Sequence, residues 1–182
     1  WYPSYMISLS IGQGELMITP IQMANLATIL ANRGYYITPH IVRSINDSIS
    51  SQIKKHVIPI DQKHFDPIVE GMQMVIKGGT GRRAQVDSIA IAGKTGTVQN
   101  PHGDDHSVFI AFAPVEDPKI ALIVYVENGV WGSRYAAPIA GLLIEKYLKG
   151  KISDTKKALE KEMFQGSLIH DTTSKGKETS NE

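Results

Sequence analysis

Four consecutive residues, Lys94-Thr95-Gly96-Thr97, carry the groups that an acyl-transfer site for a carboxylate-bearing substrate needs. They end a run rich in β-formers, and alternate residues of a strand point to the same side, so Thr95 and Thr97 should present two hydroxyls together. Lys94 adds a positive charge that attracts a carboxylate, and Gly96 lets a substrate approach the strand closely. The Thr97 N–H can face a developing oxyanion. The competing interpretation of these four residues alone is a strand end followed by a solvated turn.

Composition bounds the function classes. The chain has 182 residues, 42% of them hydrophobic, which suffices for one domain with a core. Its 19 basic and 18 acidic residues nearly cancel, which argues against nucleic-acid binding. Without cysteine, disulfides, thiolate catalysis and cysteine zinc sites are excluded. The segment 102–106 (His-Gly-Asp-Asp-His) has metal-ligand types, but a solvated loop between two strands is the simpler interpretation.

Helix signals recur along the chain. Thr19 can cap a helix that begins at Pro20, with Gln22 closing a capping box, and that helix should end near Gly34. A second helix is predicted over about 61–77, a third over about 136–148 and a short one over about 155–163. The second helix should bury one apolar stripe: Phe65, Ile68, Val69, Met72, Val75 and Ile76.

The remaining segments predict strands and loops. Residues 35–45 read as extended chain or an edge strand and 46–55 as a polar loop, while 88–97, 107–113 and 119–127 read as strands. Their short connections favour an antiparallel meander packed against the closing helix, an α+β fold. The predicted organisation is a main unit over 1–150, then a short helix and a tail over 151–182 that is disordered from about residue 172.

Several segments resemble class B penicillin-binding proteins, above all the elongation-type group called penicillin-binding protein 2. They occur in the order of that family over roughly residues 5–150, which is more specific than any single motif. The segments are Ser10–Gly14 with Thr19–Ala24, Ala92–Thr97 with Phe109–Pro114, and Glu127–Gly129 leading through Trp131-Gly132 to Ala136–Ala140.

The resemblance implies a partial penicillin-binding protein/β-lactamase-like transpeptidase fold, with an antiparallel sheet packed against helices. It also implies a serine D,D-transpeptidase that cross-links peptidoglycan stem peptides and binds β-lactams, with no cofactor and no metal. Carried over, Lys94 would assist proton transfer, Thr95 and Thr97 would hold the carboxylate, and the Thr97 N–H would form half of the oxyanion hole. Expected partners are a membrane glycosyltransferase and elongation-complex proteins, at the periplasmic face of the bacterial inner membrane.

The sequence departs from that family's pattern at the nucleophile. In the family, the Ser-x-x-Lys and Ser-x-Asn motifs precede the region of Gly12-Gln13-Gly14. In this sequence neither motif occurs before that region. The matches present, at Ser51, Ser153 and Ser174 and at Ser44-Ile45-Asn46, stand in the wrong places and are close to chance. The chain opens on Trp1, which suggests a fragment or a processed chain with any anchor upstream, and alone it should be inactive.

Two alternatives remain open. One is a β-lactamase or β-lactam sensor domain, against which the segment from Gly12 to Gln22 argues. The other is a noncatalytic domain that binds cell-wall peptides or partner proteins. Trp131 is either a core or loop-packing residue, or a wall of the substrate cleft.

Overall fold

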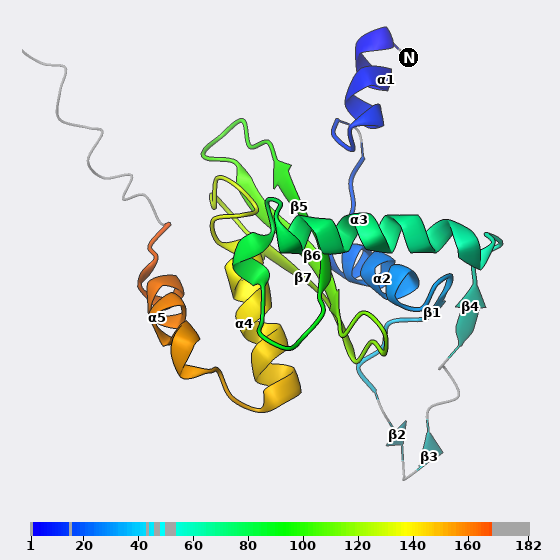
Figure 1. The fold of residues 1–182 in the computed structure, drawn as a ribbon. Helices are drawn as coiled ribbons and strands as arrows, with labels where there is room; N and C mark the ends of the chain where they lie inside the picture. Colours follow the sequence, from blue (N-terminus) through cyan, green and yellow to red (C-terminus); the bar gives the residue numbers. More distant parts are fainter. Residues whose placement is uncertain (1, 15, 43, 46–47, 50–53, 169–182) are drawn as a thin grey trace, which may run out of the picture.

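A three-stranded antiparallel sheet forms the centre of the computed structural model, which describes residues 2–14, 16–42, 44–45, 48–49 and 54–168 (Figure 1). Its strands are β5 (Ala92–Val98), β6 (His106–Ala113) and β7 (Ile120–Val126), in the order β5-β6-β7. The predicted meander is therefore confirmed, although β5 begins only at Ala92 rather than at Ser88.

Helices cover both faces of this sheet, which explains why β6 is apolar along most of its length. Neighbouring strand residues point to opposite faces, so Phe109 and Phe112, both fully buried, join different cores. Phe109 packs in the cluster that includes Ala137 of α4 (Ala136–Lys149). Phe112 packs with Ala31 of α2 (Pro20–Ala31) and Met72 of α3 (Phe65–Lys77). The α+β prediction is confirmed.

Helices α2 and α3, which precede the sheet in the chain, follow the sequence signals closely. At the start of α2, the Thr19 N–H donates to Gln22 Oε1 at 2.8 Å, as the predicted capping box requires. In α3 the stripe is buried at Phe65, Val69, Met72 and Ile76 and half-buried at Val75. Ile68 is 50% exposed, so its assignment to the stripe was wrong.

Smaller elements complete the described chain. Helix α1 (Pro3–Ser10) was not predicted. Within 35–57, β1 (Tyr35–Ile37) pairs with β4 (Lys55–Val57), and β2 (Ser44–Ile45) pairs with β3 (Ser48–Ile49). The loop predicted over 46–55 was therefore wrong for β3 and for the first residue of β4. Three 3₁₀ turns follow, η1 (Gln62–His64), η2 (Arg82–Ala84) and η3 (Asp154–Lys156), together with α5 (Lys157–Gln165). The tail predicted to be disordered lies outside the described residues. Across the described ranges, every helix is too short or too polar to cross a lipid bilayer.

Candidate active-site strand

The Lys94–Thr97 segment lies on β5, at one edge of the sheet within the described chain (Figure 1). Lys94 and Thr97 are exposed, whereas Thr95 and Gly96 are half-buried. Thr95 pairs with Phe109 and Thr97 with Ser107, so both threonines lie on the sheet face that α4 covers further along. The two hydroxyl-bearing residues thus share a face of an accessible strand.

Two hydrogen bonds arrange this strand. Lys94 Nζ donates to the Thr95 carbonyl at 2.8 Å, so the ammonium bends back along the strand. The Thr95 hydroxyl lies 2.7 Å from the Thr80 hydroxyl, which follows α3 in the turn 78–81. Sequence reasoning missed Thr80, because nothing in a glycine-rich turn indicates which strand it will contact.

The backbone of β5 offers a donor at its open edge. In an antiparallel strand the N–H and C=O of one residue point to the same side, and residues two apart share that side. The Thr95 carbonyl accepts from the exposed Lys94 ammonium, which places it on the side away from β6. We infer that the Thr97 N–H faces that open edge as well.

The connection from β7 to α4 lies against the same face of β5. Gly132 in this connection approaches so closely that a Cβ there would lie 2.7 Å from the Gly96 carbonyl oxygen and 3.1 Å from Thr95 Cβ. Trp131 beside it is 62% exposed, which excludes the interpretation of Trp131 as a core residue.

Side chains of the His102–His106 segment form hydrogen bonds with neighbouring loop residues. Asp105 Oδ1 accepts from the Asn100 N–H at 3.2 Å, and His106 Nδ1 accepts from the Asn128 N–H at 3.1 Å. In the part of the chain that the structure describes, no three His, Cys, Asp or Glu side chains gather in a way that would hold a metal ion. These contacts favour a structural role for the segment.

The serine motif matches fall away from β5 or outside the described residues. Ser153 lies in the connection from α4 to α5, with its hydroxyl 3.0 Å from the Thr155 hydroxyl, and Lys156 Nζ donates to the Gln85 carbonyl. Ser51, Ser174 and the Asn46 of the Ser-x-Asn match are outside the described residues.

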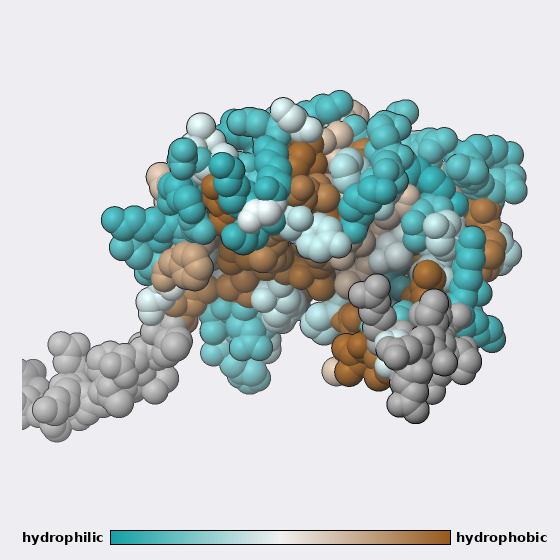
Figure 2. Space-filling view, turned by 90° about the horizontal axis from the view of Figure 1, so that it is seen from below, coloured by the Kyte–Doolittle hydropathy of each residue, from teal (hydrophilic) through white to brown (hydrophobic). Residues whose placement is uncertain are grey.

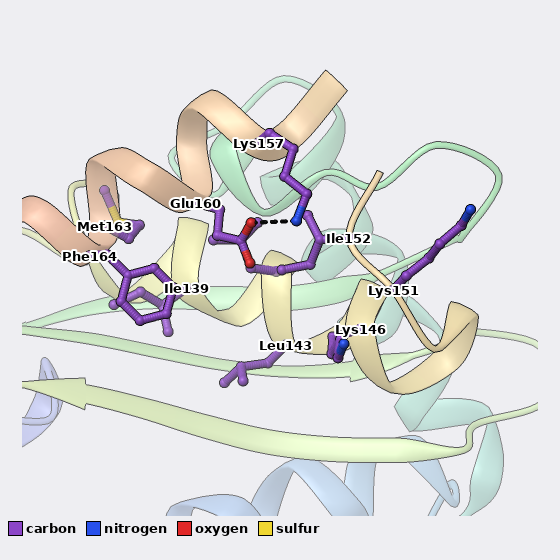
Figure 3. Close-up of a pocket in the computed structure, with 10 residues that line it drawn as sticks. Ile139, Leu143, Lys146, Lys151, Ile152, Lys157, Glu160, Met163 and Phe164 are labelled. Atoms are coloured by element: carbon purple, nitrogen blue, oxygen red, sulfur yellow. Dashed lines mark hydrogen bonds and ion pairs between the residues drawn. The ribbon is translucent and has the colours of Figure 1, made fainter. Parts of the chain in front are cut away.

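An apolar groove of about 450 Å³ lies between α4 and α5, and its lining contains no residue of β5. Its walls include Leu142, Met163 and Phe164. Lys157 and Glu160 also line it, and their side chains form an ion pair with an N–O distance of 2.7 Å. A dashed line marks this pair in Figure 3. Figure 2 shows apolar side chains in a band on the face of the molecule seen from below. The groove therefore offers apolar surface but none of the polar groups of the β5 strand.

With the geometry of β5 established, comparisons place the chain in a family. A family model described as the penicillin binding protein transpeptidase domain matches residues 1–145. The chain belongs to the penicillin-binding protein transpeptidase family. As predicted, its relatives include elongation-type members: the peptidoglycan D,D-transpeptidase MrdA of Haemophilus influenzae is 32% identical over 180 residues. That match covers 86% of this chain and 28% of the relative.

Further relatives support the same family assignment. The peptidoglycan D,D-transpeptidase PbpA of Mycobacterium tuberculosis is 34% identical over 157 residues, covering 78% of this chain and 32% of that protein. The solved PBP2 of Pseudomonas aeruginosa, in complex with WCK 5153, superimposes with a TM-score of 0.74 at 36% identity, covering 86% of this chain and 36% of that one. The chain thus spans about a third of the length of the relatives it matches.

Proposed function

We propose that this chain is the part of a serine-type peptidoglycan D,D-transpeptidase that receives the carboxylate end of the acyl donor. The observation that supports this most is the exposed edge of β5, where Lys94, Thr95 and the Thr97 N–H come together on a strand that pairs along one side only within the described chain. A terminal carboxylate is bound best by a cation and hydroxyl donors acting together. The strand supplies both.

In the proposed reaction, each group acts where charge or a proton has to be accommodated. A serine hydroxyl, supplied by a segment outside this chain, attacks the penultimate D-Ala carbonyl of a stem peptide, and negative charge develops on the carbonyl oxygen. The Thr97 N–H stabilises that oxygen, together with the N–H of the nucleophile. Lys94 assists the movement of the serine proton toward the leaving D-Ala nitrogen, and the peptide bond to D-Ala breaks. The amine of a second stem peptide then takes the acyl group, and the serine is released.

The names of the relatives agree with this role. The M. tuberculosis penicillin-binding protein A has been solved as an imipenem acyl-enzyme complex, at a TM-score of 0.67 and 30% identity, covering 78% of this chain and 33% of that one. A β-lactam acyl-enzyme is the product expected when a serine attacks a mimic of the acyl donor. We therefore propose that the full-length protein binds β-lactams and stem peptides.

We also propose partners and a location for the full-length protein. A solved peptidoglycan synthase complex, described as coordinating polymerization and crosslinking, superimposes with a TM-score of 0.74 at 28% identity, covering 84% of this chain and 27% of that one. This supports a membrane glycosyltransferase and elongation-complex proteins as partners of the full-length protein. The expected location is the periplasmic face of the bacterial inner membrane.

Fluorescent penicillin tests the proposal. The full-length protein should give a covalent, boil-resistant band that is lost when Lys94 is changed to Ala, and residues 1–182 alone should give none. A band on the isolated chain would overturn the prediction that this part is inactive alone. A full-length protein that hydrolyses a chromogenic cephalosporin with rapid turnover would instead be a β-lactamase.

A further inference from the structure

We propose that Ser107 is a positioning residue. Its buried hydroxyl holds the connection from β7 to α4, residues 127–135, against β5 and so fixes the position of Thr97 relative to the acyl donor. The inference rests on the proposed function, because it assigns a support to the same site. It goes further in naming a residue that does not touch the substrate but on which the placement of Thr97 depends.

The surroundings of Ser107 carry the argument. Ser107 is fully buried in a strand whose following residues are all apolar, and it pairs directly with Thr97. Its hydroxyl donates to the Trp131 carbonyl at 2.7 Å and accepts from the Ala136 N–H at 3.0 Å. Ala136 is the first residue of α4, whose leading N–H groups have no partner within the helix. One hydroxyl therefore joins the middle of the connection, the start of the helix and the strand.

The connection needs such an anchor because its backbone is strained. Asn128 has a φ of 55° and Val130 a φ of 64°, in the left-handed region. That region is unfavourable for a β-branched residue such as valine, and surrounding contacts must hold it there. The Val130 N–H donates to the Asp105 carbonyl at 2.8 Å, and the Ser107 bonds hold the residues that follow.

The connection 127–135 packs closely against β5 and β6. A Cβ at Gly132 would lie 2.5 Å from the Val108 carbonyl oxygen and 2.7 Å from that of Gly96, and a Cβ at Gly129 would lie 2.6 Å from Ser107 Cβ. Backbone thus meets backbone on the face that carries Thr95. Within the described chain β5 is paired along one side only, so this contact supports residues 95–97 in addition to β6 and the Thr80 hydroxyl.

Two variants of the full-length protein test this through independent contacts. Ser107→Ala removes the hydroxyl, and Gly132→Ala keeps Ser107 but forces the connection off the strand. Each should lower the second-order rate constant for acylation by fluorescent penicillin about tenfold. Since both release the same contact, the double variant should lose much less than the product of the two. The control Thr28→Ala removes a hydroxyl that bonds to the Ala24 carbonyl within α2, and its rate constant should match wild type.

Rate and amplitude separate positioning from folding. A variant that is merely less stable has fewer active molecules, so the labelling amplitude falls while the rate constant per active molecule does not. Wild-type rate constants in both Ser107→Ala and Gly132→Ala, or losses that multiply in the double variant, would overturn the inference and leave the proposed function intact. An unlabelled wild-type protein would instead overturn the proposed function, and the inference with it.

Discussion

Thr97→Val is the sharpest test of carboxylate recognition at β5. The change keeps the β-branched shape and the backbone N–H and removes only the hydroxyl. Because Thr97 is exposed at the strand edge, the free energy of unfolding should change by no more than about 0.5 kcal/mol. A hydrogen bond to a charged group contributes about 1.5–3 kcal/mol, and each 1.4 kcal/mol is a tenfold change, so acylation should slow roughly 10- to 150-fold.

The assay is the second-order rate constant for acylation of the full-length protein by a fluorescent penicillin, compared with the methyl ester of the same compound. The ester lacks the carboxylate, so wild type and Thr97→Val should react with it at similar rates. Val98→Thr makes the reverse swap at the next residue, on the opposite face of the strand, and should change neither rate. An equal loss on acid and ester, or no loss on the acid, would refute the assignment of the Thr97 hydroxyl to the carboxylate.

Three further predictions concern the scaffold. Gly141→Ala in α4 would place a Cβ 2.6 Å from a backbone oxygen of η2, and this overpacking should lower the free energy of unfolding by about 1–3 kcal/mol in urea denaturation. In α3, the Cβ added by Gly71→Ala would have no neighbouring atom within 4 Å, so this change should raise the free energy of unfolding by up to about 1 kcal/mol. A lower free energy of unfolding in this variant would contradict the helix assignment. Burial alone raises the pKa of Glu145, but hydrogen bonds from Ser153 and Lys149 outweigh it and the pKa lies below its usual value. The carboxylate therefore contributes stability above the unfolded pKa of about 4.3 that is lost as the pH falls through the folded pKa, so Glu145→Gln should flatten the acid limb of the stability curve.

Local signals in the sequence predicted most of the elements and the groups that β5 presents. The Thr19 and Gln22 pair fixed the start of α2, because both partners lie within one helical turn. The alternation of β-strand side chains placed Thr95 and Thr97 together, because a period of two is a property of the backbone itself. The family resemblance, from several segments in register, predicted the reaction class that we propose.

Tertiary structure alone decided how the strand is supported. The pairing of Ser107 with Thr97, the contact of Gly132 with Gly96 and the bond between the hydroxyls of Thr80 and Thr95 join residues far apart in the chain. Such contacts depend on strand register and on the path of connections, and no short pattern encodes either. For the same reason Ile68 fits a helical stripe in sequence yet faces solvent, because the described neighbours of α3 cover a narrower face than the stripe offers.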